Sequence, residues 1–281
     1  MRKLTLIAMV LSAFILAGVS TAMAKDTVEL AYVEWSSEVA STNVVKAVLQ
    51  EKMGYDCEIT PVGGAAMWQA VASSDVDGMV AAWLPTTHGH YLEKVEDDVE
   101  SLGPNLEGTR IGLVVPEYVE IDSIDEINDN AEKFDEQIVG IDPGAGIMSK
   151  TEKVLDDYNM DEMELMEGSG ATMTAVLKDR IEDEEWVVVT GWTPHWKFAK
   201  WDLKYLEDPK GTYGGEEYIS TIVRPGLKED MPKVYEFLDN FYWTPEDMAE
   251  VMVWNQNGMD PYESAKKWIK QNPETVESWL P

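Results

Sequence analysis

The sequence predicts an α/β protein of two lobes, each built on a mostly parallel sheet flanked by helices. Three observations support this class. Apolar runs of strand length alternate with helical stretches from Thr27 to Trp83, a second series of the same kind starts at Ile138, and an extended apolar segment follows each series. Strands that alternate with helices form parallel sheets through βαβ units.

The first series opens with an apolar run, Thr27 to Val33, that predicts a strand. Glu38 to Met53 places apolar residues at helical spacing and predicts a helix. Cys57–Val62, Ala65–Ser73 and Gly78–Trp83 then predict a strand, a helix and a strand. We expect these elements to form the core of one lobe.

The second series predicts three strands and two helices. The strands are Ile138–Ile141, Met163–Met166 and Trp186–Thr190, and the helices are Ile147–Tyr158 and Ala171–Ile181. We expect them to form the second lobe. The chain is long enough for two lobes of about 100 to 150 residues or for one large domain, so length alone does not decide between them.

Two extended apolar segments, Arg110–Val119 and Tyr218–Pro225, are predicted to cross between the lobes as strands. The division that follows assigns residues 25–113 plus 224–281 to lobe I and residues 114–223 to lobe II.

After the second crossing the sequence predicts only helices, and each begins with proline in its first turn. They are Pro232–Asn240, Pro245–Gln256 and Pro261–Gln271. We expect them to pack on the first lobe.

The first residues have the pattern of an export signal. Arg2 and Lys3 precede an apolar stretch, Leu4–Val19, and Ala22-Met23-Ala24 offers the small residues that signal peptidase needs. We expect residues 1–24 to be removed near Ala24. With no cysteine at the cleavage site for a lipid anchor, we expect a free periplasmic or extracytoplasmic protein.

The charge of the chain is strongly acidic. It carries 53 acidic and 22 basic residues, a net charge of -31 that becomes -33 once Arg2 and Lys3 are removed. Such a surface repels nucleic acid and anionic lipid. A hydrated acidic surface suits high salt and indicates a halophilic host. Cys57, the sole cysteine, has no partner for an internal disulfide and is expected to be a buried small hydrophobe.

Tryptophan is abundant, with eleven in the chain, and three of them stand where predicted strands end: Trp35, Trp83 and Trp192. Ligands bind outside the carboxyl ends of strands in open parallel sheets. A tryptophan at a strand end packs in the core by default, but all three are followed by polar, turn-rich segments. We expect the three indoles to converge on one cleft.

A quaternary ammonium group is the ligand chemistry that such a cleft favours. It has no N–H donors, and ring faces attract it by about 0.5 to 2 kcal/mol or more each, most strongly for Trp.

Asp142 to Met148 is a glycine-rich segment between a predicted strand and a predicted helix. Unpaired N–H groups at a helix start bind anions such as a carboxylate, although an ordinary tight turn is the alternative. His88, five residues after Trp83, is placed to donate a hydrogen bond to the same carboxylate. The segment lacks the P-loop Lys-Ser/Thr pair and the full dinucleotide fingerprint, which argues against nucleotide binding.

The sequence shows neither the histidine spacing of a zinc protease nor a serine elbow. We therefore expect no catalytic residues, no metal site and no cofactor. An enzyme acting on a small methylated amine is the remote alternative, and its general base would have to be His88 or Glu34.

Four motifs resemble a known family, the glycine betaine and proline betaine binding proteins of ABC importers, typified by the binding subunit of the OpuA system of bacilli. The motifs are Ala31-Tyr32-Val33-Glu34-Trp35, Ala82-Trp83-Leu84-Pro85-Thr86-Thr87-His88, Gly140-Ile141-Asp142-Pro143-Gly144-Ala145-Gly146-Ile147-Met148 and Val189-Thr190-Gly191-Trp192-Thr193-Pro194-His195-Trp196. The likeness spans essentially the whole chain after the signal, although the bacillar protein carries its two lobes in permuted order.

The resemblance implies a type II periplasmic binding protein that closes like a Venus flytrap. It implies an ammonium cage of Trp35, Trp83 and Trp192, with the carboxylate held by the N–H groups of Gly146 and Ile147 and by His88. The expected partners are a betaine and a membrane permease with its cytoplasmic ATPase, and the protein itself is expected to be a monomer. Choline, carnitine or another compatible solute is the alternative ligand, but a carboxylate-binding His88 argues against choline.

Overall fold

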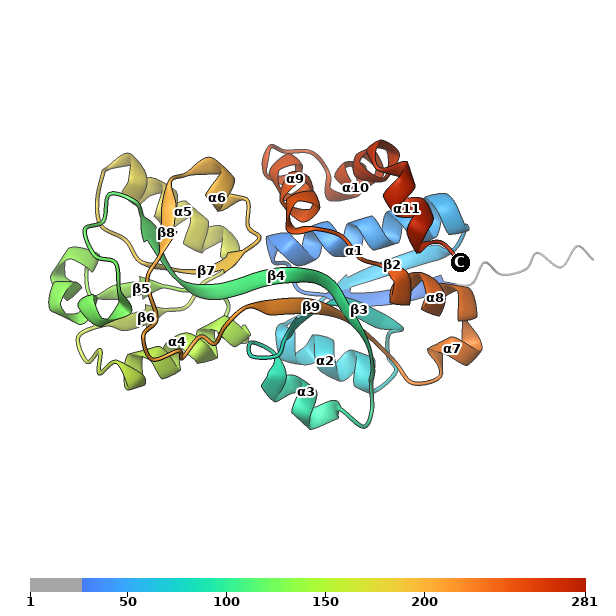
Figure 1. Cartoon of the computed structure of the whole chain (residues 1–281), viewed down its shortest axis with the longest axis horizontal. Coiled ribbons are helices and arrows are strands. Elements are labelled where there is room, and N and C mark those ends of the chain that lie inside the picture. The colour runs from blue at the N-terminus through green and yellow to red at the C-terminus, as the bar shows by residue number, and fades with distance from the viewer. Residues whose placement is uncertain (1–26) are drawn as a thin grey trace, which may run out of the picture.

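The computed structural model describes residues 27–281, so the predicted signal peptide lies outside the described residues. The strands join in one path, β2-β1-β3-β9-β4-β7-β5-β6, and β8 pairs with β4. Figure 1 shows an elongated molecule in which β4 runs through two groups of elements. We name the group around β1, β2, β3 and β9 the first half, and the group around β5 to β8 the second half.

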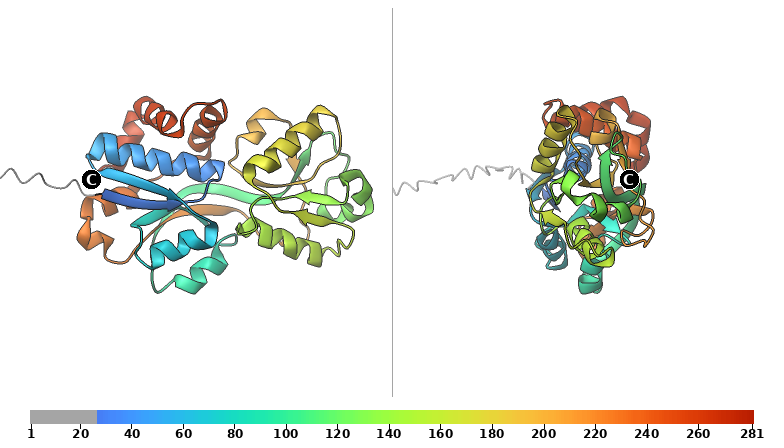
Figure 2. Two further views of the ribbon diagram at one scale, coloured as in Figure 1. Left: turned by 180° about the vertical axis from the view of Figure 1, so that it is seen from behind. Right: turned by 90° about the vertical axis from the view of Figure 1, so that its left-hand side faces the viewer.

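The first half follows the predicted βαβ order closely. Its three parallel strands are β1 (Thr27–Tyr32), β2 (Asp56–Pro61) and β3 (Gly78–Leu84). Helix α1 (Ser36–Val48) continues into the π-helical turn η1 (Leu49–Met53), and α2 (Gly64–Ala72) leads into β3. Helix α3 (Gly89–Val95), which was not predicted, follows β3. Figure 2 shows helices on both faces of the sheet, as a parallel sheet requires.

The second half repeats this design with β5 (Gln137–Val139), β6 (Glu164–Met166) and β7 (Val189–Thr193) in parallel. Helices α4 (Gly146–Asp157) and α5 (Gly170–Glu182) were predicted. Four short elements were not: η2 (Ile124–Glu126), η3 (Asn128–Phe134), α6 (Lys197–Lys200) and β8 (Leu203–Tyr205).

The prediction for β7 was wrong by three residues at its start. Trp186 lies before the strand, where its ring packs against Phe134 at 5.2 Å and lies 4.1 Å from Lys133 Nζ. Trp192 therefore lies within β7 and not after it.

Strand β4 (Glu100–Pro116) links the two halves. It pairs antiparallel with β9 (Glu217–Val223) as far as Thr109 and with β7 from Arg110 onward. The prediction missed its first ten residues because Gly103, Pro104 and Gly108 make that stretch resemble a loop. The pairing with β9 shifts register three times there, and both glycines have positive φ, so the strand bends where a sequence pattern indicates turns. The lobe boundaries given above stay predictions.

The C-terminal helices α8 (Pro232–Asn240), α9 (Pro245–Gln256) and α10 (Pro261–Gln271) have the predicted bounds. Each begins with proline, whose missing N–H is not needed in the first turn. Helices α9 and α10 contact α1, so they pack on the first half as expected. Two short helices, α7 (Leu227–Asp230) and α11 (Pro273–Trp279), were not predicted.

Tryptophans fill the core between these helices. Trp268 stacks on Trp279 at 5.7 Å and meets Trp243 edge-on at the same distance. These indoles are at most 2% exposed and lie far along the chain from the three cage candidates. They are structural residues.

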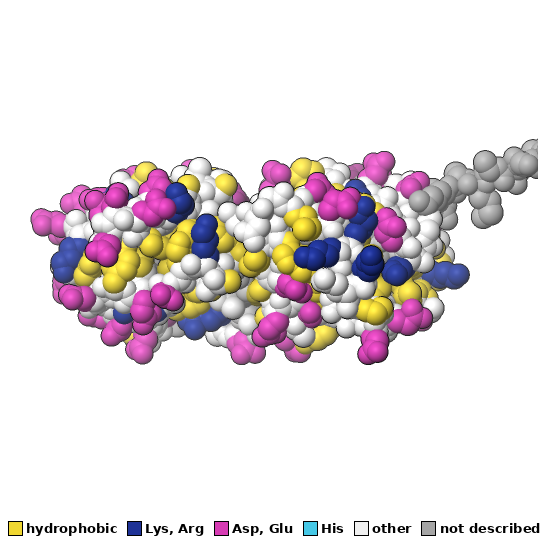
Figure 3. Space-filling view, turned by 90° about the horizontal axis from the view of Figure 1, so that it is seen from above, with side chains coloured by type: hydrophobic (Ala, Val, Ile, Leu, Met, Phe, Trp, Pro, Cys, Tyr) yellow, Lys and Arg dark blue, Asp and Glu magenta, His cyan; other side chains and the backbone are white. Residues whose placement is uncertain are grey.

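Figure 3 shows a face on which acidic side chains are scattered over both halves, with basic side chains among them. From Thr27 onward, no helix is long and apolar enough to cross a membrane.

Candidate functional site

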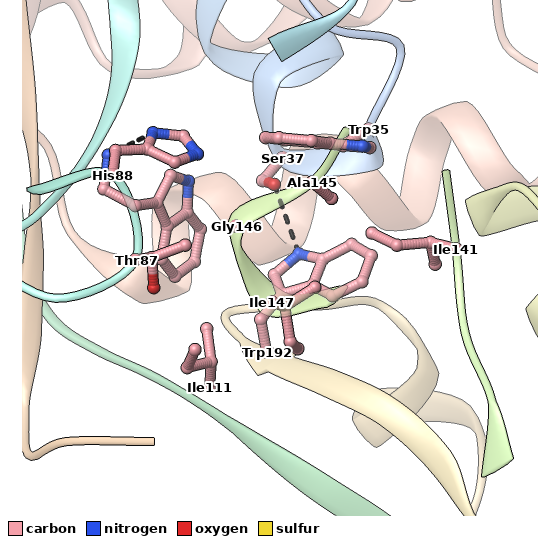
Figure 4. A pocket seen from close by; sticks show the side chains of 11 residues that line it. Trp35, Ser37, Thr87, His88, Ile111, Ile141, Ala145, Gly146, Ile147 and Trp192 are labelled. Carbon is pink, nitrogen blue, oxygen red and sulfur yellow. Dashed lines mark hydrogen bonds between the residues drawn. The ribbon is translucent and has the colours of Figure 1, made fainter. Parts of the chain in front are cut away.

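A small cavity is lined by residues of both halves. All six residues predicted to bind ligand line it, so the structure brings the complete predicted set together. The lining residues are Trp35, Ser37, Trp83, Thr87, His88, Ile111, Ile141, Ala145, Gly146, Ile147 and Trp192. Figure 4 shows Trp35 and Trp192 toward one side of this cavity and His88 with Thr87 toward the other.

Three different elements position the three indoles. Trp35 directly precedes α1, Trp83 is the next-to-last residue of β3, and Trp192 lies in β7. Each is at most 7% exposed. The strands carry them to the edge where the two halves meet, which is the arrangement expected at the carboxyl ends of parallel strands.

Each indole N–H donates to its own acceptor. Trp35 Nε1 donates to Asp142 Oδ1 at 2.9 Å, Trp83 Nε1 to Glu38 Oε1 at 2.6 Å, and Trp192 Nε1 to Ser37 Oγ at 3.3 Å. An indole whose N–H is held in this way cannot turn its ring freely. The faces of the rings, and not their polar edges, are left for a ligand.

His88 is completely buried and presents one free donor. Its Nδ1 accepts a hydrogen bond from the backbone N–H of Trp83 at 3.1 Å. Burial lowers the pKa of His88 to about 3, so the ring is neutral and its proton lies on Nε2. That Nε2 has no hydrogen-bond partner within residues 27–281.

Gly146 and Ile147 form the first turn of α4, after Ala145 at the N-cap position. Backbone N–H groups in a first helical turn have no partner inside the helix, and the dipole there favours an anion. Gly146 is required by a close approach, because a Cβ at this position would lie 2.3 Å from the carbonyl oxygen of Thr87. Glycine thus lets the start of α4 reach the loop that carries His88.

Glu217 of β9 holds the loop that follows β3 and carries His88. The carboxylate accepts the N–H groups of Thr86 and Thr87, each at 2.7 Å, and the Thr87 hydroxyl at 2.5 Å. This anchor holds Thr87 where Gly146 can contact it.

Direct hydrogen bonds join the two halves around the cavity. Besides the bonds Trp35–Asp142 and Trp192–Ser37, the Tyr91 hydroxyl donates to the carbonyl of Gly144 at 2.8 Å. The two halves are therefore in direct contact around the cavity.

Two fully buried charged side chains lie behind the cage, and sequence reasoning missed both as parts of the site. Glu38 has its pKa raised to about 7 by burial, with a further rise from nearby Asp142. Lys197 has its pKa lowered to about 7 by burial, donates to the carbonyl of Thr190 at 3.2 Å and lies 4.9 Å from the Trp192 ring. In the part of the chain that the structure describes, neither forms an ion pair.

Ser37, Thr87, Ile111, Ile141 and Ala145 also line the cavity and were not predicted. Ser37 could have been found from its place beside Trp35. The apolar residues carry no signal that separates them from ordinary core residues.

Neither base named for the enzyme alternative suits that role. Glu34 is exposed and does not line the cavity, and the low pKa of His88 makes it a poor base at neutral pH. Among residues 27–281, no group of three or more His, Cys, Asp or Glu side chains is arranged to hold a metal ion.

Comparison with known proteins agrees with this geometry. Residues 26–271 match the family model described as the substrate binding domain of the ABC-type glycine betaine transport system. Over 157 residues the chain is 52% identical to the glycine betaine/carnitine transport binding protein GbuC of Listeria monocytogenes, covering 55% of this chain. It spans about half, 52%, of that relative's length.

Two solved structures extend the comparison. Lactococcal OpuAC, in its closed-liganded conformation with glycine betaine, has a TM-score of 0.87 and 46% identity over 91% of this chain and 100% of its own. An ABC-transporter choline binding protein in complex with choline has a TM-score of 0.84 and 26% identity over 90% and 91%. These matches confirm the predicted fold, that of a type II periplasmic binding protein.

The family model covers nearly the whole described chain, and its members are substrate-binding proteins of transporters and not enzymes. This chain belongs to the family of substrate-binding domains of ABC-type glycine betaine transport systems.

Proposed function

We propose that this protein captures glycine betaine, or the related proline betaine, and delivers it to an ABC permease for uptake as an osmoprotectant. One observation carries the proposal. A single cavity presents the faces of Trp35, Trp83 and Trp192 together with free N–H donors from His88 and from the first turn of α4. Ring faces suit a trimethylammonium group and N–H donors suit a carboxylate, so the cavity fits a zwitterion.

The two ends of such a ligand would contact different halves. The cage takes Trp35 and Trp83 from the first half and Trp192 from the second. The carboxylate would lie between His88 of the first half and Gly146 and Ile147 of the second. Because these contacts are complete only when the halves meet, the ligand stabilises the closed form over an open one.

Calorimetry tests this proposal directly. The mature chain, residues 25–281, is titrated with glycine betaine, proline betaine, choline, carnitine and ectoine at low and at high salt. We expect saturable heat with at least one betaine. Absence of binding to both betaines under every condition would overturn the proposal.

Choline is the second candidate, because a relative of similar structure was solved with choline. Choline has the ammonium group but no carboxylate, so it would leave the donors of His88, Gly146 and Ile147 without an anion. An unmatched buried donor is costly. We therefore place choline behind the betaines, and the same titration ranks them.

We also propose that residues 1–24 direct export and are removed near Ala24, leaving a monomer in the periplasm or its equivalent. The partners would be the membrane permease and its cytoplasmic ATPase. The acidic composition supports a halophilic host, where compatible solutes matter. Mass spectrometry of the secreted protein would identify its first residue, and a mass that still includes residues 1–24 would contradict the export proposal.

A further inference from the structure

The Glu38 side chain connects two walls of the cage. It lies in the first turn of α1 and is completely buried. One carboxylate oxygen accepts the Trp83 N–H at 2.6 Å, and the other accepts the Ser37 hydroxyl at 2.5 Å. Ser37 lines the cavity and accepts the N–H of Trp192. Glu38 thus contacts Trp83 directly and Trp192 through one hydroxyl.

No basic side chain neutralises this carboxylate among residues 27–281, where Glu38 forms no ion pair. Another carboxylate, Asp142, which accepts the Trp35 N–H from the opposite half, raises the pKa of Glu38 further. A buried, unpaired carboxylate is costly unless a cation lies nearby.

We propose that the Glu38 carboxylate is the buried counter-charge for the quaternary ammonium group of the ligand, an inference that rests on the proposed function. A trimethylammonium group cannot donate a hydrogen bond. Its positive charge still attracts the Glu38 carboxylate across the Trp83 ring, because Coulomb interactions are strong where the dielectric constant is low. The carboxylate also polarises Trp83 through the N–H it accepts, which makes the ring face more attractive to a cation.

This role makes ligand binding depend on pH. Burial raises the pKa of Glu38 to about 7, so near neutrality part of the population carries a proton. A cation in the cage favours the ionised form and lowers that pKa. Binding therefore releases a proton to the buffer, and betaine affinity rises as the pH increases from 6 to 8.

The other titratable groups around the cage include His88, Asp142, His195 and Lys197. His195 packs against Trp192, and burial holds its pKa well below the usual value, so it stays neutral. His88 has a pKa of about 3 and stays neutral through this range. Lys197 lies beside Trp192 and has its pKa lowered to about 7 by burial. A ligand cation repels protonated Lys197, so this group also releases a proton on binding, and variants must separate the two contributions.

The test uses calorimetric titration of the mature wild-type protein, Glu38→Gln and Lys197→Met with glycine betaine, at pH 6, 7 and 8 in buffers of different ionisation enthalpy. Glutamine keeps an acceptor for the Trp83 N–H and removes the charge, while its amide NH2 faces Ser37, whose hydroxyl then accepts a hydrogen bond where it donated one to Glu38. We expect Glu38→Gln to bind glycine betaine at least tenfold more weakly at pH 8, with less proton release than wild type. Lys197→Met should keep part of the pH dependence.

A second ligand controls for loss of shape. 3,3-Dimethylbutanoate has the form of glycine betaine with carbon in place of the charged nitrogen. Glu38→Gln should weaken glycine betaine relative to this anion. If Glu38→Gln does not fold, the pH dependence retained by Lys197→Met decides the question.

The outcomes are separable. Failure of the wild type to bind any betaine overturns the proposed function. Two other results overturn the role of Glu38 alone. In the first, wild type binds betaine and Glu38→Gln binds it equally tightly with equal proton release. In the second, the pH dependence of binding disappears entirely in Lys197→Met.

Discussion

The loops that follow the tryptophans of β3 and β7 contain the same residue types in the same order. In the first half Trp83 is followed by Pro85 and His88, and in the second half Trp192 is followed by Pro194 and His195. Both tryptophans line the cavity, but only the first histidine does.

The spacing explains the difference. Four residues lie between Trp83 and His88, and the chain turns back so that His88 accepts the N–H of Trp83 and keeps Nε2 free at the cavity. Only two residues lie between Trp192 and His195, whose Nδ1 accepts the N–H of Lys197 at the start of α6 while its ring packs edge-on against Trp192. Residue type alone does not assign a role here; the number of intervening residues does.

Electrostatics distinguishes the two loops as well. Trp83 donates to a buried carboxylate, whereas Trp192 donates to a hydroxyl and has a lysine beside its ring. The carboxylate behind Trp83 therefore strengthens the attraction of that ring for a cation, whereas the lysine beside Trp192 repels a cation.

We expect the largest loss of betaine affinity from removing a cage tryptophan, the residue type that precedes both loops. Trp192→Ala should weaken glycine betaine binding by roughly 100-fold, because it removes a cation-π contact and apolar contact area together worth about 3 kcal/mol. Titration calorimetry measures the loss. Trp254→Ala, outside the cavity, is the matched control, and an equal loss there would show that the wrong indoles were chosen.

The histidines should behave differently from each other. His88→Ala should weaken glycine betaine about 10- to 100-fold, the cost of a hydrogen bond to a charged group, and leave choline nearly unchanged. His195→Ala should leave the ratio of the two affinities unchanged. Competition between the two ligands measures that ratio; a choline loss as large as the betaine loss would remove His88 from the carboxylate site.

The contact between Gly146 of the second half and Thr87 of the loop after β3 gives a third test. Gly146→Ala places a Cβ against the Thr87 carbonyl and should hold the halves apart, with about a tenfold loss of betaine affinity. Gly144→Ala is the control, because a Cβ there meets no atom within 4 Å. Small-angle scattering with saturating betaine should show a larger radius of gyration for Gly146→Ala only. Equal radii in both variants would contradict the role of this contact.

A fourth expected effect concerns stability without ligand, where the two buried charges have opposite signs. The raised pKa of Glu38 contributes stability below pH 4.5 that is lost as the pH rises through about 7. The lowered pKa of Lys197 contributes stability above pH 10.5 that is lost as the pH falls through about 7.

Glu38→Gln should therefore be more stable than wild type at pH 8 by about 1 to 3 kcal/mol, at 1.36 kcal/mol per pH unit, and nearly equal to it at pH 4.5. Lys197→Met should show its gain at pH 6 and a smaller one at pH 10. Urea unfolding across pH 4.5 to 10 measures the free energy of unfolding of both variants. An equal gain for Glu38→Gln at pH 4.5 and at pH 8 would contradict a destabilising effect of the buried, ionised carboxylate.

Much of the fold follows from local patterns. The parallel strands and their helices have short-range periodicity, and the prolines mark the starts of α8, α9 and α10. The first ten residues of β4 escape such reasoning because their pairing with β9 depends on a strand more than a hundred residues later, which tolerates Gly103 and Pro104 through bulges.

The site divides in the same way. Trp35, Trp83 and Trp192 are visible because large aromatics precede polar turns, and Gly146 because a glycine-rich segment precedes a helix. Glu38 and Lys197 resemble ordinary charged helical residues in an acidic chain. Only the packing of α1 and α6 shows that both are buried behind the cage.

The pairing of β3 with β9 has a consequence for the order of folding. Gly78 pairs with Val223, so the sheet of the first half is incomplete until the whole second half has been synthesised. Long-range pairing of this kind is slow, because a large loop must close before the contacts form. A chain that stays unfolded for longer can still be threaded through a narrow membrane channel, which would suit the export proposed for residues 1–24.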